Sequence, residues 1–395
     1  MISFRVESGA MKEISRGFSK ELARRLAEPE PLIQAVIGPR QVGKTTGVKQ
    51  VLARRGAPSL YASADGAGAF GAEWLLGVWQ RGMRLPSGGV LVVDEIQKVD
   101  GWQDVLKDLW DNHRTGGARV VVLGSSSLDI QKGLQESLAG RYELVEVHHW
   151  SLAESRELDP TLDLEQFLLF GGYPGGYRFR SSPRRWQSYI RDSILENVLN
   201  RDILRLRPLP RPALFRQFLE LLSAYPCREI SYTKLLGNLQ DKGNVEVVKH
   251  YLFLLSCAFL YRGLEKYAAK ETIKKSSSPK ILPLCPALCT RGGAMARWRD
   301  PDERGRLFET AVGAALARTE GDLYYWRDGA DEVDFVFESD RLYAIEVKSG
   351  RKRRAGGLSA FRTRFPAAGL SSITGYSSAK WISGHLSTVV QWMNA

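Results

Sequence analysis

The first part of the chain contains short runs made almost entirely of apolar residues. Three of them, residues 33–37, 90–93 and 120–123, stand beside turn-forming or polar residues. Such runs are typical of strands buried on both faces of a parallel sheet. Shorter mixed runs predict two further strands, at residues 59–64 and 143–147. The pattern therefore predicts an α/β core.

Apolar residues at helical spacing flank the first of these strands. Ile14, Phe18, Leu22 and Leu26 recur four residues apart, which predicts an amphipathic helix over residues 11–30. A second helix is expected to run to Arg55 from the loop that follows the first strand.

That loop carries the strongest motif in the chain. It reads Gly38-Pro39-Arg40-Gln41-Val42-Gly43-Lys44-Thr45-Thr46 and fits G-x-x-x-x-G-K-[ST] without a mismatch. Glycine permits the tight backbone that turns N–H groups toward a phosphate chain. Lys44 would reach the β- and γ-phosphates of ATP, and Thr45 would place its hydroxyl on Mg²⁺. A glycine-rich surface turn is the alternative, but the strand before the loop and the Lys-Thr pair favour nucleotide binding.

Two acidic residues follow the next apolar strand. Asp94 and Glu95 come directly after residues 90–93, and ligands of open α/β sheets bind at the carboxyl ends of strands. Asp94 would hold the Mg²⁺ through water, and Glu95 would orient or deprotonate the water that attacks the γ-phosphate. Taken alone, the pair could also be a helix cap.

Two later positions are candidates for the same site. Ser125 or Ser126, after the strand at residues 119–123, could sense the γ-phosphate or could simply cap a helix. Arg141 could stabilise charge on the transferring phosphoryl group, in cis or across a subunit interface of a homo-oligomer. An ordinary surface arginine is the other interpretation.

Composition describes a globular protein with a basic bias. The 395 residues are 44% hydrophobic and 25% charged. The net charge of +12 is compatible with a polyanionic binding partner. No window approaches the roughly 20 apolar residues of a membrane span, and residues 1–21 lack an apolar signal core. We therefore expect a cytoplasmic protein without a membrane partner. The four cysteines and five histidines show no metal-binding spacing.

These motifs together resemble one group of prokaryotic AAA-type ATPases. The resemblance rests on the phosphate loop, Val93-Asp94-Glu95-Ile96-Gln97, Leu123-Gly124-Ser125-Ser126-Ser127 and Leu138-Ala139-Gly140-Arg141. Gly171-Gly172-Tyr173-Pro174 and Asn200-Arg201-Asp202-Ile203 are similar to the helical lid of that group. Its members typically carry a C-terminal domain of unknown function related to the PD-(D/E)xK nuclease superfamily. The resemblance implies an ATPase core that uses ATP and Mg²⁺.

The middle of the chain is basic and helical in pattern. The lid region is rich in arginine, and prolines at 208, 210 and 212 mark a boundary. Beyond it, residues 230–236, a helix from Asn244 over 245–256 and a wing at 259–267 resemble a winged helix. Winged helices bind DNA but also serve as packing modules. Both interpretations stay open.

We expect five segments, the last an α/β nuclease-like domain. Their predicted ranges are an N-terminal helix at 1–30, a P-loop ATPase core with a parallel sheet at 31–155, a helical lid at 156–209, a winged-helix-like domain at 210–272 and a PD-(D/E)xK nuclease-like domain at 273–395.

The last domain contains a predicted hairpin with acidic residues on facing strands. If the turn centres on Asp340, Asp334 faces Glu346 and Glu332 faces Lys348. The predicted buried face comprises Val333, Phe335, Phe337, Tyr343, Ile345 and Val347. Facing carboxylates repel each other unless a positive charge lies between them, and a divalent cation would suit.

The hairpin matches the nuclease signature D-x(n)-E-x-K, with Lys348 as the lysine. The resemblance adds Glu309 as the acid on the preceding helix, but residues 280–285 offer Cys285 where many relatives have Asp. An inert domain with a solvated face and a Glu332–Lys348 pair is the alternative. The basic run 351–354 could contact phosphates, as could the basic lid and the winged helix.

Two hypotheses of function follow from the sequence. In the first, a Mg-ATPase core drives or gates a DNA-interacting, nuclease-like C-terminal half. In the second, slow ATP hydrolysis operates a regulatory switch whose C-terminal domain is inert and binds a protein partner.

Overall fold

The computed structural model describes residues 14, 16–66, 68, 70–124, 133–134, 136–203, 209, 211–239, 244–269, 277–289, 298–348 and 356–374. The chain forms two compact units. The first comprises Met1–His148 and Asn197–Arg207, and the second comprises His149–Glu196 and Pro208–Ala395.

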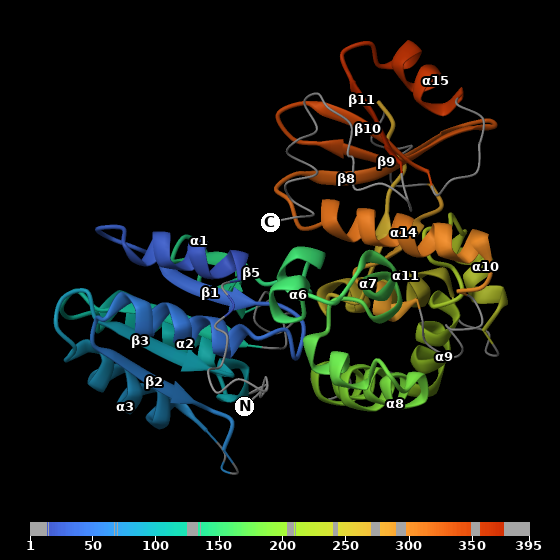
Figure 1. The fold of residues 1–395 in the computed structure, drawn as a ribbon. Helices are drawn as coiled ribbons and strands as arrows, with labels where there is room; N and C mark the ends of the chain where they lie inside the picture. The colour runs from blue at the N-terminus through green and yellow to red at the C-terminus, as the bar shows by residue number, and fades with distance from the viewer. Residues whose placement is uncertain are drawn as a thin grey trace. The chain divides into compact units, whose positions relative to one another are not determined.

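A five-stranded parallel sheet with the order β2-β3-β4-β1-β5 forms the centre of the first unit (Figure 1). Its strands are β1 (Ile33–Ile37), β2 (Ser59–Ser63), β3 (Val90–Asp94), β4 (Arg119–Gly124) and β5 (Tyr142–Glu146). Every residue of β1 and of β3 is buried. The predicted α/β core with a parallel sheet is confirmed.

The helices of this unit cover both faces of the sheet. They are α1 (Gly17–Leu26), α2 (Lys44–Arg55), α3 (Ala72–Met83) and α4 (Trp102–Asn112). Helix α2 connects β1 to β2 at the edge of the sheet, whereas α3 and α4 connect β2 to β3 and β3 to β4 in the opposite direction. Right-handed connections therefore place α2 on the face opposite α3 and α4. Phe18, Leu22 and Leu26 of α1 are buried, as the stripe predicts. The helix ends well before residue 30 because Pro29 disfavours a helical conformation at the residue before it.

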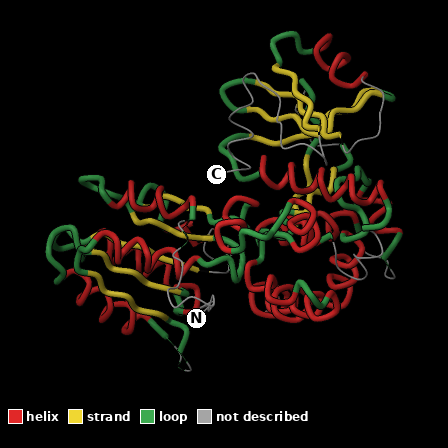
Figure 2. Tube along the Cα trace, viewed as in Figure 1, coloured by secondary structure: helices red, strands yellow, loops and turns green. Residues whose placement is uncertain are grey.

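The beginning of the second unit is mostly helical (Figure 2). Its elements are α6 (Leu152–Leu158), α7 (Leu164–Phe170), the 3₁₀ segment Pro174–Phe179, α8 (Pro183–Ser188), the π-helical segment Tyr189–Leu195, α9 (Pro212–Leu222), α10 (Tyr232–Gly237) and α11 (Val245–Cys257). The side chain of Asn244 accepts a hydrogen bond from the backbone N–H of Val247, so the predicted start of α11 is confirmed. Antiparallel strands β6 (Tyr261–Leu264) and β7 (Lys280–Pro283) follow. The winged-helix assignment stays a prediction.

The C-terminal part of this unit is a four-stranded sheet with a helix on each face (Figure 1). Its elements are α14 (Pro301–Leu316), β8 (Asp322–Asp328), β9 (Asp331–Glu338), β10 (Leu342–Lys348), α15 (Gly356–Arg364) and β11 (Gly369–Thr374). Leu342 pairs with Glu338 and Ile345 with Phe335, so the predicted hairpin register is confirmed along these pairs. Because α15 covers the face opposite α14, the alternative of a solvated face is not what the structure shows.

The predicted face of Val333 is also wrong. Phe335, Phe337 and Ile345 pack with α14, whereas Val333 packs with Val336, Ala344 and Phe361 on the other face. The cause is an extra residue in β9: Tyr324 pairs with Val336, but Trp326 pairs with Val333. Such a bulge reverses the alternation of side chains between residues 333 and 335.

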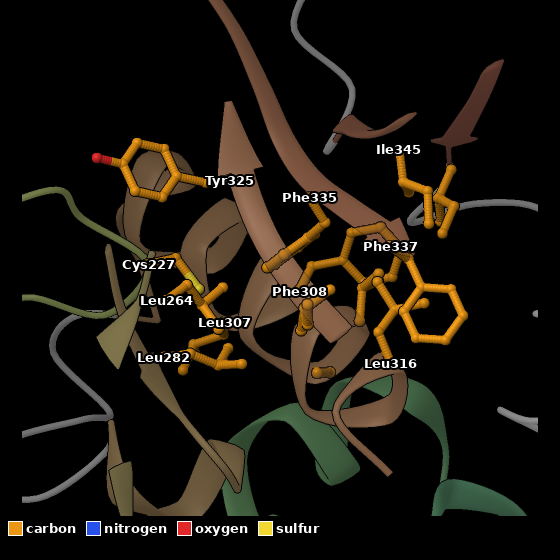
Figure 3. Packing of buried hydrophobic residues seen from close by; sticks show 14 of the residues in the cluster. Cys227, Leu264, Leu282, Leu307, Phe308, Leu316, Tyr325, Phe335, Phe337 and Ile345 are labelled. Atoms are coloured by element: carbon orange, nitrogen blue, oxygen red, sulfur yellow. The ribbon is translucent and has the colours of Figure 1, made fainter. Parts of the chain in front are cut away.

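The larger core of the second unit joins α14 to the sheet. Phe308 of α14 packs with Phe335 and Phe337 of β9 in one buried cluster (Figure 3). Leu282 of β7 belongs to the same cluster, which ties the strand before α14 to the sheet that follows it. Among the helices of the described residues, none is long and apolar enough to cross a membrane.

We predict that Phe335→Ala destabilises the protein by about 3–5 kcal/mol, because it removes a fully buried ring and leaves a cavity. The measurement is unfolding by denaturant, followed by circular dichroism. Phe253→Ala is the control, since this side chain is 56% exposed on α11 and its loss should change stability by less than about 0.5 kcal/mol. Equal effects of the two substitutions would contradict the packing described.

Candidate functional site

The predicted phosphate loop connects β1 to the first turn of α2. Gly38 follows β1, and a Cβ added to it would lie 2.1 Å from the carbonyl oxygen of Val147, so a larger residue cannot be accommodated without a shift. Gly43 has a φ of 90°, in the left-handed region that glycine tolerates best. The loop therefore depends on glycine at both ends of its motif.

Lys44 lies in the loop as its first helical residue. Its side chain is 8% exposed, and Nζ donates hydrogen bonds to the carbonyl oxygens of Gly38, at 2.9 Å, and of Pro39, at 2.8 Å. The ammonium therefore stands at the N-terminus of α2, where the helix dipole is also positive. Both features favour an anion at this place.

Thr45 and Asp94 are brought together by the sheet. Asp94 is the last residue of β3 and is 7% exposed. Thr45 Oγ1 donates a hydrogen bond of 3.1 Å to Asp94 Oδ2. A hydroxyl and a carboxylate in direct contact are oxygen donors of the kind that Mg²⁺ prefers, so these residues fit the ion that the fold implies.

Tyr61 is a member of this site that the sequence did not indicate. Its hydroxyl donates a hydrogen bond to Asp94 Oδ2, the oxygen that also accepts from Thr45. Burial, together with this hydrogen bond, raises the pKa of Tyr61, so the hydroxyl stays protonated and acts as a donor. No motif marks the residue, because its contact follows from the pairing of β2 with β3.

Glu95 has an unusual backbone conformation. Its φ of 55° lies in the left-handed region, which costs a residue with a Cβ about 1 kcal/mol or more. Its N–H donates to Asp94 Oδ1 at 3.0 Å, and Gln97 Nε2 donates to its Oε2. Strain of this kind concentrates at functional sites. The predicted catalytic pair Asp94 and Glu95 thus lies at the carboxyl edge of the sheet, as Thr45 does.

The remaining predicted site residues of the first unit are the serines at 125 and 126 and Arg141, and the structure describes only the arginine. Ser125 and Ser126 lie outside the described residues, directly after β4, and their role stays a prediction. Arg141 precedes β5, and its carbonyl oxygen accepts from the N–H of Ile33 at the start of β1. It therefore lies at the amino edge of the sheet, opposite the phosphate loop. Its guanidinium makes two hydrogen bonds to Asp111, of 2.7 and 2.8 Å, and its role in cis or in trans stays a prediction.

A second candidate site is a cavity of about 1070 Å³ within the second unit. Its lining includes all four predicted acidic and basic candidates of the nuclease-like site, namely Glu309, Asp334, Glu346 and Lys348. Glu332, Arg228, Arg306 and Arg327 also line it. The structure therefore gathers the predicted residues around one cavity, with charges of both signs.

Lys280 lies at the centre of this acidic group, although the sequence did not single it out. It is 1% exposed, and Nζ lies 2.6 Å from Glu309 Oε1 and 3.7 Å from Asp334 Oδ1. Nζ also donates to the carbonyl oxygen of Asp334 at 2.9 Å. Cys285, by contrast, is buried elsewhere and accepts a hydrogen bond from the N–H of Gly172.

Opposing effects determine the pKa values of Lys280 and Glu309. Burial lowers the pKa of the Lys280 ammonium, but Glu309 and Asp334 raise it more, so the net direction is upward. Burial raises the pKa of Glu309 to about 7, and the charge of Lys280 opposes that rise. The lysine therefore carries its charge at neutral pH.

The other acidic side chains of the cavity also have partners within the protein. Asp334 Oδ2 accepts from the N–H of Val347 at 2.7 Å, and Lys348 Nζ lies 3.3 Å from Glu346 Oε2. Glu332 accepts from Arg327, so the Glu332–Lys348 pair considered from the sequence is not what the structure shows. Within the described ranges, no three His, Cys, Asp or Glu side chains are arranged to hold a metal ion. These residues do not fit the divalent cation that the nuclease resemblance implies.

Comparisons with known families match three parts of the chain. An AAA domain matches residues 30–155. A domain of unknown function (DUF8612) matches residues 161–291, and another (DUF4143) matches residues 304–389. The AAA-type assignment made from the sequence is confirmed by the first match, while the relation of the C-terminal domain to nucleases stays a prediction.

Among solved structures, the Holliday junction branch migration motor RuvB of Thermotoga maritima is similar to part of the chain. It is 14% identical, with 63% of this chain and 90% of that chain covered, at a TM-score of 0.35. A likeness this weak supports no inference about function.

Two curated relatives are similar over much greater lengths. Uncharacterized protein Rv2008c of Mycobacterium tuberculosis is 30% identical over 335 residues, covering 82% of this chain and 72% of the relative. Uncharacterized protein Mb2031c of Mycobacterium bovis matches with the same values. The chain therefore belongs to the same protein family as Rv2008c and Mb2031c, and it carries an AAA domain.

Proposed function

We propose that the AAA domain binds ATP together with Mg²⁺ and hydrolyses it. The observation that carries this proposal is the meeting of Thr45 and Asp94, 3.1 Å apart, at the carboxyl edge of the sheet beside Lys44 and Glu95. A phosphate-binding lysine, two oxygen donors and a nearby carboxylate are the parts that phosphoryl transfer to water requires.

Each residue has a distinct role in this proposal. Lys44 exchanges the carbonyl oxygens of Gly38 and Pro39 for the β- and γ-phosphate oxygens, and the N–H groups of residues 38–46 surround the phosphates. Thr45 and Asp94 hold the Mg²⁺, which supplies positive charge next to the phosphates. Glu95 orients the attacking water and accepts its proton. Tyr61 keeps the Asp94 carboxylate in place.

Two further roles remain part of the proposal. Ser125 senses the γ-phosphate from the end of β4, the strand between β1 and β3. Arg141 acts only on the nucleotide of another subunit, because it lies at the opposite edge of its own sheet. The proposed role of Arg141 requires a homo-oligomer. We also propose that the protein is cytoplasmic.

Two hypotheses concern the C-terminal half. In one, the ATPase drives or gates a nuclease-like half that interacts with DNA through the basic lid, the winged-helix-like segment and residues 351–354. In the other, hydrolysis operates a regulatory switch and the C-terminal domain binds a protein partner without catalysis. The ammonium of Lys280 inside the acidic group favours the second.

We predict that Lys44→Ala abolishes tight ATP binding, because it removes the side-chain cation that would reach the β- and γ-phosphates. Calorimetric titration with ATP and Mg²⁺ measures this. Lys20→Ala, at an exposed position of α1, makes the same chemical change and should bind like the wild type. Unchanged affinity of Lys44→Ala would refute the site.

For Glu95→Gln we expect nucleotide affinity to persist while turnover falls by about 10²-fold or more, since the general base is lost. Phosphate release under saturating ATP measures turnover. Glu73→Gln, exposed at the start of α3, is the matched control and should keep full activity. A variant at position 95 that hydrolyses ATP at the wild-type rate would place the base elsewhere.

The two hypotheses for the C-terminal half predict different responses to DNA. Duplex or single-stranded DNA should raise the ATPase rate several-fold if the first is correct, with an effect that declines as salt rises. If the switch hypothesis is correct, the rate should be the same with and without DNA. The rate should be measured at low and at physiological ionic strength, with Glu95→Gln as the background control.

A further inference from the structure

We propose that the ammonium of Lys280 is the resident cation of the acidic site in the C-terminal domain, in the place that a divalent metal ion would take. The domain then keeps a metal-type arrangement of carboxylates but binds no metal there. This inference concerns the second unit and does not depend on ATP hydrolysis in the first.

The first support is the origin of the groups around Nζ. Glu309 comes from α14 and Asp334 from β9, and both approach a lysine of β7. A carboxylate on the helix and a carboxylate on the adjoining sheet are the acids that the nuclease signature assigns to its metal. Glu332 Oε1 lies 3.9 Å away and adds a third negative charge at longer range.

The second support is burial. Lys280 is 1% exposed, and charged side chains are almost never buried this completely unless they are paired. Its partners are carboxylates, a carbonyl oxygen and the ring of Phe335, whose centroid lies 4.9 Å from Nζ. Removing the lysine would leave Glu309 without its closest opposite charge, which is costly in a buried place.

The third support is that Asp334 and Glu346 have further partners within the protein. Asp334 accepts the N–H of Val347, and Glu346 has Lys348 beside it. A divalent ion entering this site would have to displace a buried ammonium and then stand next to its positive charge. Metal binding is therefore opposed as long as Lys280 is present.

This inference yields a specific expectation about a single substitution. Lys280→Met keeps an unbranched apolar side chain of nearly the same length but removes the charge. The carboxylates of Glu309 and Asp334 would then face each other without a cation, and a divalent ion would relieve their repulsion. The variant should gain a metal site that the wild type lacks.

The experiment uses the full chain without nucleotide and measures Mn²⁺ bound per chain by equilibrium dialysis. Because the AAA domain can also bind the ion, the informative quantity is the part of the binding that Asp334→Asn removes. Wild type and Asp334→Asn should bind equally. Lys280→Met should bind about one additional ion, and Lys280→Met with Asp334→Asn should lose it. Lys234→Met, at an exposed position of α10, should gain none.

Two results would overturn the proposal. One is Mn²⁺ binding by the wild type that Asp334→Asn abolishes, which would show that a metal binds despite the lysine. The other is a folded Lys280→Met protein that gains no ion, which would reduce Lys280 to an ordinary buried ion pair. If Lys280→Met does not fold, the comparison of wild type with Asp334→Asn still decides the first point, and Lys280→Gln replaces methionine for the second.

Discussion

The carboxylate of Asp94 is the point on which the arrangement of the first unit depends. It accepts hydrogen bonds from Thr45 at the start of α2, from Tyr61 in β2 and from the N–H of Glu95. One buried side chain at the end of β3 thereby links the first turn of α2 to the middle of β2. A buried carboxylate is tolerated only with such partners, so the geometry that would hold a cation is also what keeps the edge of the sheet in order.

Two buried lysines among the described residues, Lys44 and Lys280, show how the partner of a charge decides its role. Lys44 donates to the carbonyl oxygens of Gly38 and Pro39, and a phosphate oxygen would offer its ammonium a stronger, charge-assisted interaction than these neutral acceptors. Lys280 lies against the acidic side chains of Glu309 and Asp334, so the ammonium already has partners of opposite charge within the protein. The first lysine is suited to bind a ligand, and the second is suited to take the place of one.

What the sequence could predict follows from how local each feature is. The strands of the first unit, the phosphate loop and Asp94 with Glu95 are encoded in contiguous residues, and the structure places them as expected. Tyr61 was missed because its contact depends on the pairing of β2 with β3. Lys280 was missed because its contacts with Glu309 and Asp334 depend on the tertiary packing of β7 beside α14 and β9, which belong to different parts of the sequence. The position of Arg141 could have been predicted from the sequence. A residue directly before a parallel strand lies at the amino edge of the sheet, opposite the residues that follow the strands.

The bulge in β9 explains how the second site can exist within a packed sheet. In a regular strand, Asp334 and Phe335 would point to opposite faces. The extra residue between Val333 and Val336 breaks that alternation, so the carboxylate of Asp334 and the ring of Phe335 both approach the ammonium of Lys280. The same irregularity moves Val333 to the face covered by α15, where it packs with Phe361. A strict period of two would have kept the hydrophobic core but separated the acid from its cation. The bulge therefore links the packing of this domain to the electrostatics of its cavity.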